Sequence, residues 1–218
     1  AQLNDFKVLN NQLTGSLPWE IAGLSELLVL QAQNNSLSGS IPETLCHSNK
    51  LIVLQLNDNR FNGTIPNCIG NLNKLKYLSF TNNALTGSIP RGIGRLSVLQ
   101  QLWLSNNRLS GSLPQELGML RKLEMAYLQN NSLSGTLPAS IGNCTLLKML
   151  SVHDNSISGS LPPSLGQLTS LRYLWLGDNT LSGTIPSNLG QMSHLQEVYL
   201  LGNRLSGPIP DTIGRLKN

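Results

Sequence analysis

The stretches LSNNRLSGSLPQELGML (residues 104–120) and LGDNTLSGTIPSNLGQM (residues 176–192) decide the fold, because they are two copies of one motif. In both stretches an Asn, here called the motif Asn (Asn107 and Asn179), is followed four residues later by a Gly, and that Gly is followed three residues later by a Pro. Nine of the eleven prolines of the chain stand at this position of the motif. The motif Asn recurs at one constant interval, without insertion or deletion, at Asn11, Asn35, Asn59, Asn83, Asn107, Asn131, Asn155, Asn179 and Asn203. Such a period indicates a repeat architecture.

The segment before each motif Asn reads L-x-x-L-x-L and predicts a short strand, because its last two apolar positions alternate with a period of two. Parallel stacking of these strands from coil to coil builds a core made of columns. We expect two inward columns, formed by Phe6, Leu30, Leu54, Leu78, Leu102, Ala126, Leu150, Leu174 and Val198, and by Val8, Ala32, Leu56, Phe80, Leu104, Leu128, Val152, Leu176 and Leu200.

The remaining motif residues predict how the chain leaves and re-enters each strand. The Asn amide is expected to turn inward and bond backbone groups of the buried bend. The Gly permits a positive φ, and the Pro fixes φ and prevents a regular helix from continuing through it. Because only about eight residues separate each Pro from the next strand, the return segment is expected to form a short 3-10 turn.

Both quoted stretches resemble the plant-specific class of leucine-rich repeats, which is marked by the block L-x-G-x-I-P. This class occurs in ectodomains of receptor-like kinases and receptor-like proteins, and in secreted polygalacturonase-inhibiting proteins. The resemblance implies an α/β repeat solenoid. It would be a right-handed superhelix with a concave parallel β-sheet, a second short sheet from the L-x-G-x-I segments, and a 3-10 or irregular convex side. Residues 1–218 would form a single domain of about nine repeats of roughly 24 residues each.

The resemblance also draws attention to the two ends of the chain. Family members usually carry Cys-paired caps, which shield the last hydrophobic coil. This chain opens with Leu3, Phe6 and Val8 and stops at Asn218, with no Cys near either end. We therefore expect it to be the middle of a longer chain, or to have its ends covered by a partner.

The two columns that alternate with the inward positions are expected to face outward on the concave side. They hold six of the seven Trp and Tyr residues, here called the aromatic stripe: Tyr77, Trp103, Tyr127, Tyr173, Trp175 and Tyr199. Their parity is wrong for the core, which leaves cross-strand pairing or a recognition surface, and we favour recognition over ~25 Å of sheet. The predicted ligand-binding residues are Tyr77, Trp103, Met125, Tyr127, Met149, His153, Arg172, Tyr173, Trp175 and Tyr199.

Composition argues against several functional classes. Charged residues make up 12 % of the chain and the net charge of +4 is dispersed, so we expect no nucleic-acid partner. No apolar stretch approaches the ~20 residues that cross a bilayer, so we expect no membrane contact by this segment. The three His lie in different repeats, and no nucleophile–base pair is apparent, so we expect no metal, no cofactor and no enzyme activity.

Cysteines and glycosylation motifs favour a secreted, extracellular or cell-surface protein. Cys46 and Cys68 lie in neighbouring coils and are candidates for a disulfide, provided that their Cα atoms are close enough. Cys144 takes the place of a core Leu and is expected to be a buried free thiol. Asn-x-Ser/Thr acceptors for N-glycosylation occur at Asn34, Asn62, Asn130 and Asn143.

The preferred functional hypothesis is a ligand-recognition ectodomain of a plant-type receptor-like kinase or receptor-like protein, which binds a peptide or protein on its concave face, with a co-receptor as a further candidate partner. A secreted inhibitor of a cell-wall hydrolase, similar to polygalacturonase-inhibiting proteins, is the first alternative. A structural or assembly scaffold is the second. Peptide receptors of this family often hold a ligand carboxylate with two adjacent Arg; here Arg172 stands alone on that face, which argues against such a ligand.

Overall fold

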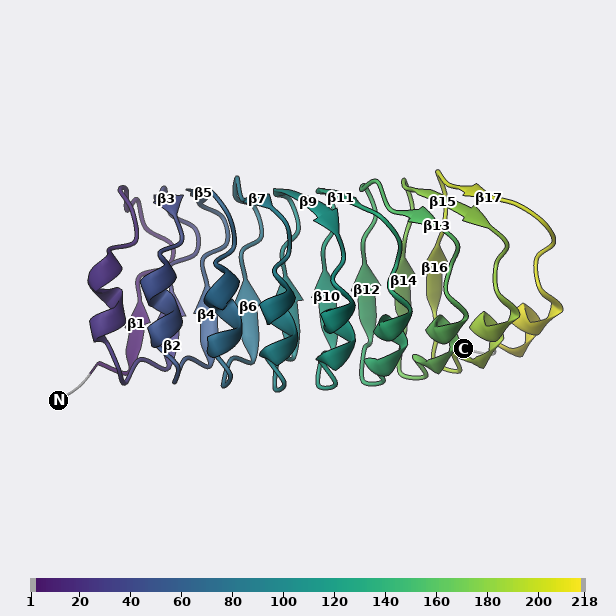
Figure 1. The fold of residues 1–218 in the computed structure, drawn as a ribbon, viewed down its shortest axis with the longest axis horizontal. Helices are drawn as coiled ribbons and strands as arrows, with labels where there is room; N and C mark the ends of the chain where they lie inside the picture. The colour runs from purple at the N-terminus through teal and green to yellow at the C-terminus, as the bar shows by residue number, and fades with distance from the viewer. Residues whose placement is uncertain (1–2, 217–218) are drawn as a thin grey trace.

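The computed structural model describes residues 3–216, which wind into a stack of coils arranged in chain order along the long axis of the molecule (Figure 1). One strand from each coil joins a nine-stranded parallel sheet in the order β1-β2-β4-β6-β8-β10-β12-β14-β16. Each strand residue pairs with its equivalent in the next coil, as Met125 does with Met149. The strands are β1 (Asp5–Lys7), β2 (Val29–Gln31), β4 (Val53–Gln55), β6 (Tyr77–Ser79), β8 (Gln101–Trp103), β10 (Met125–Tyr127), β12 (Met149–Ser151), β14 (Tyr173–Trp175) and β16 (Glu197–Tyr199).

The convex side is made of 3-10 turns, and residues 3–216 contain no α-helix. Each turn starts directly after the motif Pro, whose extended ψ prevents a longer helix from running through this point. The turns are η1 (Trp19–Gly23), η2 (Glu43–His47), η3 (Asn67–Asn71), η4 (Arg91–Arg95), η5 (Gln115–Met119), η6 (Ala139–Asn143), η7 (Pro163–Gln167), η8 (Ser187–Gln191) and η9 (Asp211–Arg215). The expectation of 3-10 rather than α-helical return segments is confirmed.

A second set of short strands runs along one edge of the stack, the upper edge in Figure 1. These strands form three small parallel sheets from the L-x-G-x-I segments, as the resemblance implied. They are β3 (Ser38–Ser40), β5 (Arg60–Asn62), β7 (Thr86–Gly87), β9 (Arg108–Ser112), β11 (Ser132–Ser134), β13 (Ser158–Gly159), β15 (Thr180–Gly183) and β17 (Arg204–Leu205).

The core consists of the expected columns. The first inward column is buried from Leu30 to Leu174 and the second from Ala32 to Leu176. At the first coil the side chain of Phe6 is 36 % exposed. Burial in the columns is what holds neighbouring coils together, because a single coil has no other apolar surface to cover its inward side chains.

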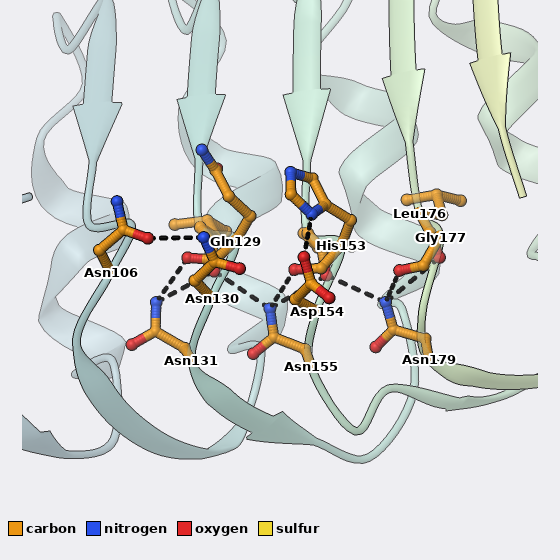
Figure 2. A network of polar contacts seen from close by, with 12 residues as sticks. Asn106, Gln129, Asn130, Asn131, His153, Asp154, Asn155, Leu176, Gly177 and Asn179 are labelled. Atoms are coloured by element: carbon orange, nitrogen blue, oxygen red, sulfur yellow. Dashed lines mark hydrogen bonds and ion pairs between the residues drawn. The ribbon is translucent and has the colours of Figure 1, made fainter. Parts of the chain in front are cut away.

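The motif Asn connects each coil to the one before it. Asn131 Nδ2 donates to the carbonyl oxygens of Leu104, Leu128 and Gln129 at 3.0, 3.1 and 3.2 Å. Its Oδ1 accepts from the backbone N–H of Leu109 at 3.0 Å. The same four bonds recur from Asn35 to Asn203, and Figure 2 shows three of these Asn in successive coils. The predicted inward amide is therefore correct, and half of its bonds reach the preceding coil.

Glycine also controls how closely the convex turns approach one another. Gly118, in η5, has an ordinary φ, but a Cβ at this position would lie against the carbonyl oxygen of Ser140 in the next turn, closer than real Cβ atoms come. Gly111 serves differently, because its φ of 73° belongs to the left-handed region. A motif Gly thus supplies conformational freedom, whereas the turn Gly supplies space.

Two cysteines of the convex side are joined to each other and the third is free. Cys46, in η2, and Cys68, in η3, form a disulfide with a Cα–Cα distance of 5.8 Å. Cys144 is a buried free thiol whose Sγ donates to the carbonyl oxygen of Leu117 at 3.3 Å. Burial raises the pKa of the Cys144 thiol to about 11, so this group stays protonated and unreactive at neutral pH.

Removing the disulfide with the double change Cys46→Ser and Cys68→Ser is expected to lower the free energy of unfolding by about 3 kcal/mol, because the unfolded chain loses a cross-link over 22 residues. Urea unfolding of both proteins measures the difference. Reductant should lower the stability of the original chain by a similar amount and leave the variant unchanged. A chain whose unfolding curve is insensitive to reductant would contradict this prediction.

Candidate functional site

The outward side chains of the nine-stranded sheet form two clusters of rings. The first cluster lies on β8 and β10, where the rings of Trp103 and Tyr127 meet edge to face with centroids 5.9 Å apart. Both side chains are half-buried. An edge-to-face pair on neighbouring strands leaves part of each ring surface free for a ligand.

The second cluster surrounds Trp175 on β14. Its indole lies 6.2 Å from the ring of Tyr173, 6.3 Å from that of His153 and 5.5 Å from that of Tyr199, which it stacks against at an interplanar angle of 8°. Trp175 Nε1 also donates to Glu197 Oε2 at 3.3 Å. Three ring neighbours and one hydrogen bond fix this indole, so Trp175 is the organising residue of the stripe.

Strand β12 separates the two clusters and corrects one expectation. Strand parity predicts that Met149 faces the ligand, but its side chain is 5 % exposed. It pairs in register with Met125 on one side and Tyr173 on the other, so long side chains flank it on both neighbouring strands. Alternation along a strand sets the direction in which a side chain points, but its exposure also depends on the length of the side chains on the adjacent strands.

The remaining predicted residues lie around these clusters. Tyr77 on β6 is half-buried and lies one strand before the first cluster, and Met125 is half-buried within it. Arg172 is exposed just before β14 and forms no salt bridge with any residue from 3 to 216. Lys148, at the same position one coil earlier, is paired with Glu124 at 2.6 Å. Arg172 is therefore a cation available to a ligand at the edge where the strands begin.

Unpartnered buried polar atoms are concentrated on this face. Among the described residues, buried side-chain atoms without a hydrogen-bond partner include the hydroxyls of Ser79 and Ser151, Trp103 Nε1, and the carbonyl oxygens of Gln33 and Gln129. All five belong to the sheet or to the bend that follows it. Sequence analysis missed the two serines, because a Ser in an outward column is expected to be solvated.

The opposite edge, where the strands end, carries a continuous row of Asn and Asp, which sequence analysis did not predict as a row (Figure 2). The residue before each motif Asn has a positive φ, for example 55° at Asn130. Asn130 Nδ2 donates to Asn106 Oδ1 in the previous coil at 2.6 Å, and His153 Nδ1 lies 2.6 Å from Asp154 Oδ2. The signal was present in the sequence, since Asn, Asp and Gly are the residues that tolerate a left-handed backbone.

The predicted glycosylation acceptors fall into two groups. Asn34 and Asn130 belong to this edge row, and each already donates its amide to the Asn one coil earlier. All four acceptors are exposed, but the side-chain amides of Asn62, at the end of β5, and Asn143, at the end of η6, bond no other described residue. Asn62 and Asn143 are thus the acceptors most open to modification.

The described part of the chain contains neither a cluster of metal-ligating side chains nor a membrane-spanning helix. Within residues 3–216, no three His, Cys, Asp or Glu side chains are grouped so that they hold a metal ion. In the same part of the chain, no helix has the length and apolar character needed to cross a bilayer.

Comparison with known families identifies the repeats. The profile described as a leucine-rich repeat region matches residues 65–159. The single leucine-rich repeat profile matches residues 26–48, 50–72, 170–192 and 194–216. No curated protein sequence matches this chain at a significant level.

Several plant proteins are among the solved structures with the same architecture. The Arabidopsis receptor kinase HAESA, in complex with the peptide hormone IDA and the co-receptor SERK1, has a TM-score of 0.96 and 33 % identity, over 99 % of this chain and 36 % of that one. The PEPR1–AtPEP1 complex has a TM-score of 0.82 and 29 % identity, over 98 % and 33 %. A plant ice-binding protein has a TM-score of 0.70 and 28 % identity, over 95 % and 74 %.

The chain thus spans about a third of the length of the HAESA and PEPR1 chains. The motif, the parallel stacked sheet, the 3-10 turns and these two kinds of comparison agree with one another. This chain belongs to the leucine-rich-repeat family, with repeats of the plant extracellular class.

Proposed function

We propose that this chain is a ligand-recognition segment of an extracellular plant receptor-like kinase or receptor-like protein, and that it binds an extended peptide or a protein across its concave sheet. The observation that carries the proposal is the pair of ring clusters around Trp103 and Trp175, which occupy outward positions that the core does not require. Trp and Tyr of this kind are enriched at binding hot spots. The receptor kinase HAESA, which this chain resembles, was solved in complex with a peptide hormone and a co-receptor.

A glycan placed on the concave face tests the proposal. Tyr77→Asn creates the acceptor Asn-Leu-Ser on β6, and Gln167→Asn creates the acceptor Asn-Leu-Thr on the convex turn η7. Both variants and the original chain would be produced in a secretory host, glycan occupancy checked by mass, and each protein tested against a displayed library of random twelve-residue peptides and a purified fungal polygalacturonase.

We expect peptides to bind the original chain and Gln167→Asn. Binding should be lost in Tyr77→Asn, because a bulky glycan beside the ring clusters would block the approach of a ligand. Capture of the polygalacturonase alone would favour the hydrolase-inhibitor alternative. Binding that survives the glycan at residue 77 but is lost with the glycan at residue 167 would place the site on the convex side and contradict the proposal.

A second candidate function is ice binding. One exposed Ser or Thr follows the motif Gly in every coil except the last, and these hydroxyls bond no other described residue. We call them the exposed hydroxyl row: Ser16, Ser40, Thr64, Ser88, Ser112, Thr136, Ser160 and Thr184. Neighbouring hydroxyls repeat at the coil spacing of about 4.8 Å, and a regular array of unpaired hydroxyls matches an ordered layer of water. The similarity to the plant ice-binding protein points in the same direction.

Ice recrystallisation in sucrose solution tests this candidate. The chain is expected to keep ice grains small, and the double change Ser112→Lys and Thr136→Lys should abolish the effect, because two long cations interrupt the middle of the exposed hydroxyl row. Gln167→Lys, on an exposed convex turn, is the matched control and should remain active. A chain that leaves ice grains as large as buffer does would rule the candidate out.

A further inference from the structure

The concave sheet contains the same Ser–Trp pair twice. Ser79 pairs in register with Trp103 on the next strand, and Ser151 pairs in register with Trp175. The second pair lies three coils after the first, since β6 and β12 are three steps apart in the order of the sheet. The serine side chains point away from the core columns, yet Ser79 is 2 % exposed and Ser151 is 0 % exposed. Each serine therefore lies beneath the larger side chains beside it.

Neither hydroxyl has a hydrogen-bond partner within the described residues. A buried hydroxyl without a partner costs free energy, because it has given up water and gained nothing in return. Alanine or valine would fill either position without this cost. An unpartnered hydroxyl that stands beside an outward Trp in both pairs points to a partner that arrives with a ligand.

In the first pair, Ser79 and Trp103, the indole N–H is also without a hydrogen-bond partner among the described residues. In the second pair, Trp175 Nε1 donates to Glu197, 22 residues further on. The equivalent residue for Trp103 is Met125, whose thioether is at best a weak acceptor. Trp103 Nε1 is accordingly buried and unpartnered. The first pair therefore presents two donors, an indole N–H and a hydroxyl, and both require an acceptor oxygen.

We propose that the two Ser–Trp pairs are subsites for hydrogen-bond acceptors of one extended peptide that crosses the strands. This inference rests on the proposed recognition of a peptide by the concave sheet. The acceptors are side-chain oxygens of Asn, Gln, Asp or Glu, because an oxygen on a stem of two or three carbons reaches under a ring where a backbone carbonyl does not. The flanking rings rotate to admit it, as interface side chains commonly do on binding.

The geometry specifies the spacing of the two acceptors. Three coils at an inter-strand distance of ~4.8 Å separate the subsites by ~14 Å, and an extended chain advances ~3.4 Å per residue, so about four residues span the gap. Residues i and i+4 of an extended peptide also point to the same side, since its side chains alternate with a period of two. One peptide thus directs both acceptors toward the sheet.

Selection from a displayed library of random twelve-residue peptides on the original chain tests the proposal. The selected sequences are expected to be enriched in Asn, Gln, Asp or Glu at positions four apart. Ser79→Ala and Ser151→Ala should each weaken a selected peptide by about threefold to tenfold. Neither change should lower the midpoint of thermal unfolding, because the hydroxyl that is lost makes no bond in the free protein. Ser110→Ala, in the short strand β9, is the control and should bind normally.

The outcomes are distinguishable. If peptides are selected without this spacing and bind both serine variants as tightly as the original chain, the subsites are wrong, while peptide recognition stands. A marked fall in the thermal midpoint of Ser79→Ala or Ser151→Ala would show that the hydroxyl is structural, which also overturns the subsites. If the original chain selects no peptide, both the subsites and the proposed peptide function are rejected.

Discussion

Replacing Asn131 with Ala is expected to lower the free energy of unfolding by about 3–5 kcal/mol, a large share of the stability of most domains. The change removes the four hydrogen bonds that this amide makes. It also leaves the N–H of Leu109 and the carbonyl of Leu104 without this partner in a bend that excludes water. Because both groups belong to the preceding coil, the damage extends to two coils. Urea unfolding monitored by circular dichroism measures the loss.

Asn130 is the matched control for this prediction. It precedes Asn131 directly, but its side chain is exposed and makes a single bond, to Asn106. Asn130→Gly keeps the positive φ of 55° accessible and should change stability by less than about 0.5 kcal/mol. Equal losses in the two variants would show that the inward amide is no more important than the exposed one, contrary to the structure.

Replacing Trp175 with Ala is expected to weaken ligand binding by about 2–4 kcal/mol, which is roughly a 30-fold to 1000-fold loss of affinity. The substitution removes one of the two indoles of the stripe and the support that it gives to Tyr173, Tyr199 and His153. Glu197 would also lose the indole N–H that it accepts. Calorimetric titration of a peptide or protein captured by the original chain gives the affinity of both proteins.

Trp19→Ala provides the control for a general effect of losing an indole. Trp19 is 67 % exposed on the convex turn η1, far from the aromatic stripe, and its removal should leave affinity unchanged. Trp103→Ala is expected to have a smaller effect than Trp175→Ala, because Trp103 has one ring neighbour where Trp175 has three. Undiminished binding by Trp175→Ala would show that the ligand binds elsewhere than at the concave ring clusters.

Most of the fold was predictable from the sequence because the repeat is free of insertions. With every motif at the same interval, the period sets the register of the sheet, and the motif Pro sets the start of each turn. The role of the motif Asn followed from elementary polar satisfaction. Burial at a particular coil did not follow, because exposure depends on the sizes of neighbouring side chains, as Met149 and Ser151 show.

The candidate site was predictable in outline but not in its polar detail. Strand parity places the six rings on one face, yet it carries no information about which rings touch one another. The contact of His153 with Trp175 joins a bend to a strand one coil away, which alternation along a strand does not describe. The row that includes Asn106 and Asn130 was not predicted, because its positions are filled by Asn, Asp or Gly and not by one invariant residue type.

The bonds of the motif Asn have a further consequence for the way this chain responds to tension. Each amide links its coil to the preceding neighbour, so a pulling force applied along the chain would detach coils one at a time from an end. Every coil released adds up to about 80 Å of contour length, since an extended chain spans ~3.3–3.6 Å per residue. The Cys46–Cys68 cross-link holds 22 residues out of that extension. A force–extension trace would therefore contain one short step among otherwise equal ones, and reductant would restore its full length.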